Sequence, residues 1–420
     1  MKTIFKIFHI LLLTIITAGC SNDENPSSLD NINDIPSLDE IELNVQEMAT
    51  NEAINEFGFN LFKRICAYSH ENKHNVLISP FEGAISLASI ANGCDESAEN
   101  KIKEVLNYRD ISLLNQTCNK LLRYIPAWSN GAQMAIGNSV WFSGETDLDK
   151  SFVNTMNNMF YAEVNRTDFG PEHGKSAINA WCNTKTHGKI TTLLDDINPT
   201  ARLLFANTLF FDGYWLKEFN SSKTHKSTFL GTSRQSEVDM MFHEYVGFHY
   251  DFEKADGIPL NLNGGTTVLF LLPKKGVSID ELTESFSYSE WSTVDTDAHR
   301  SQKTIMLYIP KFAMECATDI GLTFRMMGLA SDKGDFSQIG AGSAQSYSVL
   351  QKVRAVIDEE GYYQTTDNNN VIPAYSPYPD SDGDFLIKVR RIIFDRPFLF
   401  FVYNNITKTI VVAGKICDIQ

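Results

Sequence analysis

The chain has 420 residues, and its 36 Lys and Arg against 52 Asp and Glu give a formal net charge of -16 at pH 7. This acidic balance excludes a generic binder of nucleic acid or of anionic membranes, because phosphate groups select basic surfaces. Hydrophobic residues make up 43% of the chain and charged residues 21%. These are globular proportions, which exclude a disordered chain and a multispan membrane protein.

The first twenty residues have the pattern of an exported lipoprotein. Two lysines precede an apolar stretch at 7–16, which is too short to span a bilayer, and small residues then lead to Cys20. These small residues resemble a lipobox, although Thr17 stands where that pattern usually has Leu. We therefore expect residues 1–19 to be a signal peptide and Cys20 to carry the lipid that holds the protein to the membrane. A plain cleaved signal and an uncleaved anchor are the alternatives.

Residues 20–50 are expected to form an acidic flexible tether. They hold eight Asp or Glu and no Lys or Arg, interspersed with Ser, Asn and Pro, which is typical of solvated segments. The acidic residues directly after Cys20 also resemble the signal that sends Bacteroidetes-type lipoproteins to the cell surface. We therefore expect an outer-membrane lipoprotein that is exposed at the cell surface, although an acidic linker needs no such reason. Removal of the signal leaves a charge of 34 - 52 = -18.

Residues 51–420 have the patterns of one α+β domain. Apolar residues at three- and four-residue steps predict an amphipathic helix over 46–68, and Val76–Ile78 predicts a short strand. Later apolar runs of strand length predict buried strands, and they lie at 203–211, 267–272 and 398–403. A turn then leads into 409–414 and predicts a C-terminal hairpin. Helices cluster in the first half and strands in the second, without βαβ alternation or a repeat, which favours α+β.

Six cysteines remain after Cys20, and they are expected to be buried thiols rather than disulfides. Export permits disulfides, but these cysteines are scattered, have no short repeated spacing and stand in apolar contexts. They are Cys66, Cys94, Cys118, Cys182, Cys316 and Cys417.

Two motifs resemble metal sites, and their contexts disfavour both readings. His70–His74 matches the zinc pattern H-E-x-x-H, but polar residues stand where a buried metal helix needs apolar ones. Asp380–Asp384 supplies oxygens at alternate positions, as a calcium loop does, but lacks the Glu that completes an EF-hand. No nucleophile elbow, phosphate loop or dinucleotide fingerprint is present. We expect no metal, no cofactor and no enzymatic activity, and a metalloprotease is the remote alternative.

Residues from about 51 to 417 resemble the serpin family, and six separated motifs in the family's order carry the resemblance. They are Asn75–Pro80, Ile178–Trp181 with Thr186–Ile190, Asn207–Trp215, Met240-Met241 with Leu272-Pro273, Ile309–Phe312 and Phe394–Phe400. One such motif would be weak, but six in the family's order over almost the whole mature chain are specific.

The resemblance implies three β-sheets surrounded by helices, with an exposed reactive-centre loop. In inhibitory serpins a protease attacks this loop, and the acyl-enzyme is trapped when the loop inserts as a new strand into the large sheet. It therefore implies a monomeric inhibitor of serine or cysteine proteases on the bacterial envelope, with the hinge and loop at 358–390.

The hinge departs from the inhibitory pattern. Glu359-Glu360-Gly361 matches the family's start, but Tyr362 and the residues after it replace a Thr or Ser and a run of alanines. Strand alternation places Tyr362, Gln364, Thr366 and Asn368 on the inward face, where each unpaired polar group costs about 1–3 kcal/mol. We therefore expect slower or incomplete insertion. The alternative is a non-inhibitory serpin whose long acidic loop is a binding module or a plain protease substrate.

The loop is roughly ten residues longer than is usual in the family, so the count to the scissile bond depends on its starting point. Counting about seventeen residues on from Glu359 gives Tyr375-Ser376, and Tyr suits the apolar pocket of a chymotrypsin-like or cathepsin G-like protease. Counting back from Pro397 gives Leu386-Ile387. Tyr378 and the absence of any reactive bond are further alternatives.

Four residues match or replace the polar cluster at which the family's central sheet opens. Ser79 and Asn207 match it, whereas Glu82 stands where a second Ser is common and Gln351 where a His is common. We expect a Glu82–Gln351 hydrogen bond, and the alternative is that Glu82 faces solvent. Trp181 is expected to have a structural role beside this cluster.

Overall fold

The computed structural model describes residues 42–68, 74–128, 133–143, 148–169, 173–197, 201–294, 300–329, 333–334, 336, 339, 345–360 and 389–420. Its helices are α1 (Val45–Tyr68), α2 (Pro80–Ala91), α3 (Glu96–Leu106), α4 (Ile111–Trp128), α5 (Lys150–Met159), α6 (His173–Lys185), α7 (Ile279–Ser285), α8 (Tyr288–Trp291) and α9 (Ile320–Met326). Its strands are β1 (Val76–Ile78), β2 (Gln133–Phe142), β3 (Ala162–Arg166), β4 (Leu203–Asp212), β5 (His225–Leu230), β6 (Gln235–Asp251), β7 (Ala255–Leu262), β8 (Thr266–Pro273), β9 (Arg300–Pro310), β10 (Phe312–Asp319), β11 (Lys333–Gly334), β12 (Gln345–Ile357), β13 (Val389–Ile393), β14 (Phe398–Asn404) and β15 (Ile410–Ile416). This is the expected α+β class.

The first helix begins inside the range predicted to be a tether. Helix α1 starts at Val45, and Leu43 and Glu47 are already buried. Glu47 forms a salt bridge of 2.7 Å with Lys120 on α4. Its charge therefore attaches α1 to α4 and is not exposed to solvent. The domain therefore begins before residue 51.

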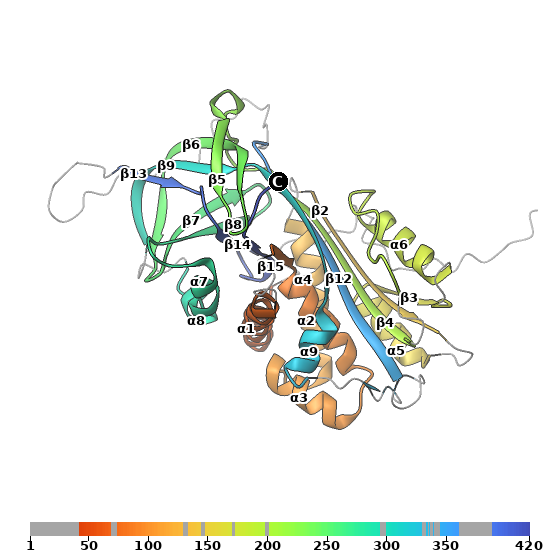
Figure 1. Ribbon diagram of the computed structural model, residues 1–420. Coiled ribbons are helices and arrows are strands. Elements are labelled where there is room, and N and C mark those ends of the chain that lie inside the picture. Colours follow the sequence, from red (N-terminus) through yellow and green to blue (C-terminus); the bar gives the residue numbers. More distant parts are fainter. Residues whose placement is uncertain are drawn as a thin grey trace, which may run out of the picture.

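The six-stranded sheet has the order β10-β12-β4-β2-β3, with β11 on the edge of β12. Its central strands β4 and β12 run parallel, paired from Leu203↔Tyr347 to Asp212↔Val356. Helix α2 covers one face of this sheet and α6 the other (Figure 1). Because both faces are covered, β4 is apolar on both sides of Asn207 and Thr208, and this explains why 203–211 appears in the sequence as a mostly apolar run.

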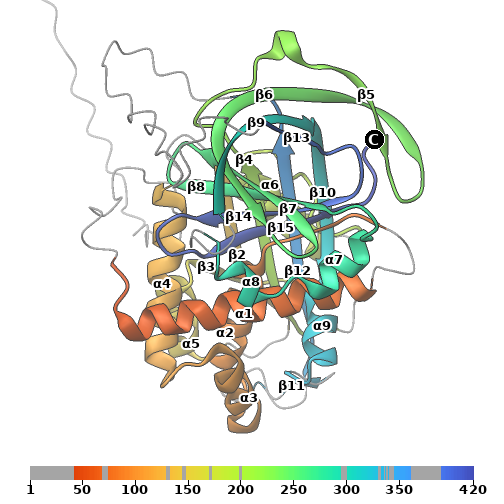
Figure 2. The same ribbon diagram turned by 90° about the vertical axis from the view of Figure 1, so that its left-hand side faces the viewer.

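The nine-stranded sheet has the order β1-β15-β14-β8-β7-β6-β9-β13, with β5 paired to β6. Among the described strands, its two parts meet where the end of β6 pairs with β7, at Tyr250↔Gly257 and Asp251↔Asp256. The three sheets that we expected are therefore the six-stranded sheet and two parts of a continuous one. Helix α1 runs beneath β14 and β15, whose hairpin was predicted (Figure 2).

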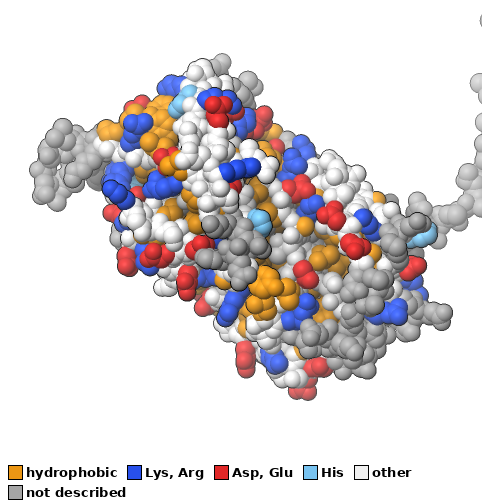
Figure 3. All heavy atoms as spheres, in the orientation of Figure 1, with side chains coloured by type: hydrophobic (Ala, Val, Ile, Leu, Met, Phe, Trp, Pro, Cys, Tyr) orange, Lys and Arg blue, Asp and Glu red, His pale blue; other side chains and the backbone are white. Residues whose placement is uncertain are grey.

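The six cysteines after Cys20 are free thiols, as predicted, and all but Cys316 are buried. Among the described residues, no helix is both long and apolar enough to cross a membrane, and no group of three His, Cys, Asp or Glu is placed to hold a metal ion. Acidic and basic side chains are intermingled on the face in Figure 3, and no large area of its described part carries one sign of charge.

Candidate functional site

A row of three amide side chains crosses the middle of the six-stranded sheet. Asn138 on β2 is the register partner of Asn207 on β4, which is in turn the partner of Gln351 on β12. Register partners on neighbouring strands point to the same face, and this face is the one that α2 covers. Asn207 Nδ2 donates to Asn138 Oδ1 at 2.6 Å.

The start of helix α2 closes this row from above. Ser79 caps the helix by accepting from the backbone N–H of Glu82 at 3.1 Å. Gln351 Oε1 accepts from the backbone N–H of Ser79 at 2.8 Å, and its Nε2 donates to the Ser79 carbonyl at 2.9 Å. Ser86, one turn further along α2, donates to Asn207 Oδ1. One glutamine side chain therefore ties β12 to the N-cap residue of this helix.

Glu82 lies in the centre of the cluster and is fully buried. Its Oε2 accepts from Asn207 Nδ2 at 3.2 Å, and its Oε1 has no hydrogen-bond partner among the described residues. Burial raises the pKa of Glu82 to about 8, although the hydrogen bond from Asn207 lowers it. The side chain is therefore mostly a neutral acid at pH 7.

The hydrogen bond expected between Glu82 and Gln351 is absent from the described contacts. Both polar atoms of the Gln351 side chain are occupied by the backbone of Ser79, and Glu82 turns to Asn207 instead. The solvent-facing alternative for Glu82 is also wrong, because its exposed fraction is 0%. The structure brings Ser79, Glu82, Asn207 and Gln351 together.

Two members of the cluster, Asn138 and Ser86, were missed in the sequence. The available signal for Asn138 was its position between the apolar residues Ile136 and Val140, in the segment that forms β2. Ser86 had no comparable signal, because small polar residues are common in helices.

Trp181 lies on the opposite face of the sheet and does not belong to this cluster. It stands on α6 in a separate apolar group with Leu204, Ala206 and Phe210 of β4, which alternate with Asn207. Its ring packs edge-on against Trp141, with 6.4 Å between the ring centroids. Its role is to attach α6 to the sheet.

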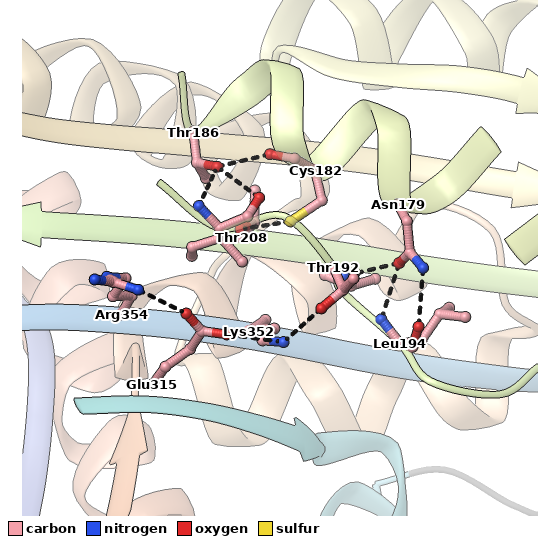
Figure 4. Close-up of polar contacts among 11 residues, drawn as sticks. Asn179, Cys182, Thr186, Thr192, Leu194, Thr208, Glu315, Lys352 and Arg354 are labelled. Carbon is pink, nitrogen blue, oxygen red and sulfur yellow. Dashed lines mark hydrogen bonds and ion pairs between the residues drawn. The ribbon is translucent and has the colours of Figure 1, made fainter. Parts of the chain in front are cut away.

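Helix α6 and the segment after it hold the two central strands from this second face (Figure 4). Cys182 on α6 contacts the hydroxyl of Thr208 on β4 at 3.3 Å. Lys352 on β12 donates to Thr192 Oγ1 at 3.2 Å and forms a salt bridge of 2.9 Å with Glu315 on β10. We call α6 and the segment that follows it, up to Leu194, the cover. The cover is bonded to both β4 and β12, so separation of these strands must break at least one of the two attachments.

The cover is also bonded within itself. Asn179 Oδ1 accepts from the backbone N–H groups of Leu193 and Leu194 at 2.8 and 3.1 Å, and its Nδ2 donates to the Leu194 carbonyl at 3.0 Å. Thr186 Oγ1 accepts from the N–H of Ile190 at 2.9 Å. Thr192 is consequently held in place and does not follow Lys352 freely.

The chain that leaves β12 is held outside the sheet by the segment that leaves β4. Trp215 donates from Nε1 to the Asp358 carbonyl at 2.6 Å and from its backbone N–H to the Glu360 carbonyl at 3.0 Å. The N–H of Phe219 donates to the Glu359 carbonyl at 3.1 Å. Three consecutive carbonyls therefore have fixed partners immediately after Ile357, where β12 ends.

The side chain of Glu359 is fixed as well. Its Oε1 accepts from Thr224 Oγ1 at 2.9 Å, and its Oε2 lies 2.7 Å from Lys311 Nζ. Partial burial tends to raise the pKa of Glu359, but the hydrogen bonds from Lys311 and Thr224 outweigh it and hold the pKa below its usual value. The family motif at 309–312 contained Lys311, but its role as the partner of the hinge was missed.

The other predicted site residues lie outside the described residues. They are Cys20, Gly361, Tyr362, Tyr375 and Ser376, together with His70 and the Asp380–Asp384 segment.

The site thus consists of two parallel central strands, a polar cluster on the face that α2 covers, and a chain segment after β12 that is bonded to residues 215–219. A family model described as serpin (serine protease inhibitor) matches residues 52–419. The chain therefore belongs to the serpin family.

Relatives and solved structures agree with this assignment. An uncharacterized serpin-like protein of Methanosarcina acetivorans is 25% identical, over 98% of this chain and 96% of its own length. The fold is similar to that of mouse protein Z-dependent protease inhibitor, with a TM-score of 0.76, 21% identity and coverage of 89% of this chain and 98% of that one. It is equally similar to the thermophilic serpin tengpin in its native state, with a TM-score of 0.76, 22% identity and coverage of 90% and 96%.

Proposed function

We propose that this serpin inhibits serine or cysteine proteases as a suicide substrate, by insertion of its loop between β4 and β12. The observation that carries the proposal is the parallel pairing of these two strands at the centre of the sheet. The chain leaves β12 at the same end of the sheet at which β4 ends. If it turns back between them, it runs antiparallel to both, and two antiparallel ladders replace one parallel ladder.

The chemistry of the trap is that of the attacking protease. Its nucleophile adds to the carbonyl of the scissile bond, and the peptide bond breaks to leave an acyl-enzyme and a new amino terminus on the leaving segment. Insertion of the loop then carries the acyl-enzyme to the far end of the sheet before water hydrolyses the ester. A difference of about 1.4 kcal/mol in the insertion barrier changes the trapping rate tenfold.

The register of an inserted strand follows from the turn that precedes it. If residues 358–361 form a four-residue turn in the inserted state, Tyr362 would pair with Ile357, Gln364 with Ala355 and Asn368 with Gln351. Ile357, Ala355 and Gln351 are buried on the face that α2 covers, so these three loop residues enter the same face.

In this register Asn368 would lie beside the polar cluster, level with Asn207 and Gln351. It would stand between Asn207 and Gln351 and extend the amide row to four members. Glu82 Oε1, which has no described partner, lies at this level, and the Asn368 carbonyl is a suitable acceptor for its acid proton. This match favours the inhibitory function.

The non-inhibitory function remains the second candidate, and Tyr362 and Gln364 favour it. At their positions an inserted strand meets only the apolar neighbours Ile357 and Ala355. Burial of an unpaired amide costs about 1–3 kcal/mol, which slows insertion. In that case the loop serves as a binding module or is simply cut.

The deciding experiment is incubation of residues 21–420 with chymotrypsin-, elastase- and trypsin-like proteases, followed by denaturing gels and N-terminal sequencing of the released peptide. We expect an adduct that resists denaturation, with chymotrypsin favoured, and a new N-terminus at Ser376. Clean cleavage of the loop without an adduct would reject inhibition of these proteases and support the second candidate.

We further propose that the protein acts as a monomer on the outer surface of the bacterial outer membrane, anchored through a lipid on Cys20. The support is the lipobox-like pattern and the acidic residues after it. Labelled fatty acid should enter the wild type and not Cys20→Ser, and an externally added protease should digest the protein on intact cells. Resistance of the wild type on intact cells, with digestion after lysis, would place it on an inner face.

A further inference from the structure

A cavity of about 750 Å³ lies between residues 215–219, strand β6 and strand β7. Its volume falls in the range of small-molecule sites, and the trapping function described above makes no use of it. It shares Trp215 and Phe219 with the contacts that hold the hinge.

One side of the cavity is formed by four rings in contact. Trp215 and Phe219 pack edge-on with centroids 5.6 Å apart, Phe219 lies 5.3 Å from His243, and His243 stacks on Tyr245 at 5.1 Å. Leu216 also lines the cavity, although 53% of its surface is exposed. Rings and aliphatic groups around a concave site favour a flat apolar ligand.

The charged side chains around the cavity are all basic. Lys217, Arg300 and Lys408 line it, and none of its described lining residues is Asp or Glu. None of the described carboxylates forms a salt bridge with Lys217 or Arg300, and the Arg300 guanidinium lies 3.4 Å above the ring of Phe248. A basic lining in a chain of net charge -16 favours an anionic group on the ligand.

The ring of His243 adds no charge to this lining. Burial, followed by the nearby Lys217 and Lys223, lowers the pKa of His243 to about 4, so the ring is neutral at pH 7. The charges of Lys217 and Arg300 are therefore not balanced by any described carboxylate that lines the cavity.

A residue that lines the cavity has a buried hydroxyl without a partner among the described residues. Tyr245 lines the cavity, its Oη is buried, and none of the described residues exchanges a hydrogen bond with it. Buried Tyr hydroxyls are normally hydrogen-bonded. The backbone makes room for this ring, because a Cβ at Gly247 would lie 2.2 Å from Tyr245 Cε2.

We propose that this cavity binds a small amphipathic anion, in which a flat ring system carries a carboxylate or sulfonate. The rings lie against Trp215, Phe219 and His243, and the anionic group lies toward Lys217 and Arg300. The Tyr245 hydroxyl donates to the ligand.

The test uses two dyes with the same rings. 8-Anilinonaphthalene-1-sulfonate carries a sulfonate, and N-phenyl-1-naphthylamine is its neutral counterpart. Titrated into residues 21–420, which contain every described residue, the sulfonate dye should saturate at one site per chain. It should bind at least about fivefold more tightly than the neutral dye, because only the former pairs with the cations. Equal affinities of the two dyes would overturn the proposal.

Variants locate the site. Lys217→Met with Arg300→Met should weaken the sulfonate dye by about fivefold or more and leave the neutral dye unchanged. Lys101→Met on α3, outside the cavity, is the matched control and should bind both dyes as the wild type does. Unchanged sulfonate affinity in the double variant would overturn the proposal.

A second variant guards against misfolding. Tyr245→Phe retains the ring and removes a hydroxyl that has no described partner, so we expect it to fold and to bind the sulfonate dye about two- to fivefold more weakly. If that affinity is unchanged, the hydroxyl does not contact the ligand, and the proposed binding mode is wrong.

Occupancy of the cavity should stabilise the hinge outside the sheet, and this part of the inference rests on the proposed function. The ligand packs against Trp215 and Phe219, which hold the carbonyls of residues 358–360. The sulfonate dye should therefore slow the appearance of the protease adduct, and an unchanged rate at saturation would refute the coupling. If no protease forms an adduct, the proposed function fails while the measured dye affinity still decides the binding site.

Discussion

At the scale of single residues, Glu82 shows how a fold can hold an acid in its neutral form. The nearest donor is the amide of Asn207, and no described cation compensates its charge. Its pKa of about 8 in the folded protein exceeds the ordinary value of 4.5. The folded state therefore binds one more proton than the unfolded state between these two values.

The pH dependence of stability follows from this difference. Unfolding releases the proton, so the contribution of Glu82 is fully present below about pH 4.5 and is lost as the pH rises to 8, with a slope of at most about 1.4 kcal/mol per pH unit. Glu82→Gln should remove this slope and raise Tm more at pH 8 than at pH 5. Thermal unfolding at both pH values measures it, with the exposed Glu96→Gln as control. An equal change in Tm at both values would contradict the predicted protonation state.

At the scale of elements, the attachment of the α6 segment to β12 predicts the ease with which the sheet opens. Lys352→Met retains the aliphatic stem but loses the bond to Thr192 and the salt bridge to Glu315, whereas Arg354→Met loses only a bond to Glu315 on β10. We expect the former to accelerate insertion by roughly five- to thirtyfold, for a barrier lowered by about 1–2 kcal/mol. The rate at which a synthetic peptide of residues 362–374 anneals to the protein, followed on native gels, measures this. Equal rates in the two variants would refute a role for the Lys352–Thr192 bond.

The loop itself gives the complementary prediction. Tyr362→Ala with Gln364→Ala removes the bulk and the amide that meet apolar neighbours on insertion, so the ratio of adduct to cleaved product should rise several-fold. Thr365→Ala is the matched control, because alternation places it on the other face. Asn368→Leu should lower the ratio, since it brings an apolar group beside Asn207, Gln351 and the acid of Glu82. A rise after Asn368→Leu would show that the register is wrong.

Elements were easier to predict from the sequence than side-chain partners. The strands at 203–211 and 398–403 stand out because each is buried on both faces, so burial alone fixes their composition. The partner of Gln351 is a backbone, and the partner of Glu359 is Lys311, 48 positions away. A sequence shows which groups need a partner, but only the fold brings one within reach.

At the scale of the whole molecule, the two central strands of the six-stranded sheet are paired in parallel, although each could pair antiparallel with an inserted strand. Strands β4 and β12 share ten parallel register pairs, and an inserted loop would pair antiparallel with both. Insertion must first break the bonds of Glu359 to Lys311 and Thr224, and the bond between the cover and β12. These contacts contribute to the barrier to insertion. This arrangement is metastable if the loop inserts fully.

Cleavage in the loop removes the covalent restraint and tests this directly. We expect the cut protein to have a Tm higher by about 10 °C or more, since several kcal/mol are gained and each raises the Tm of a large domain by about 2 °C. The measurement is thermal unfolding before and after limited chymotrypsin digestion, with the protease quenched before heating and mock-digested protein as control. An unchanged Tm after complete cleavage would mean that the loop stays out of the sheet. In that event the polar cluster around Glu82 serves the stability of the closed sheet, and the long loop serves recognition.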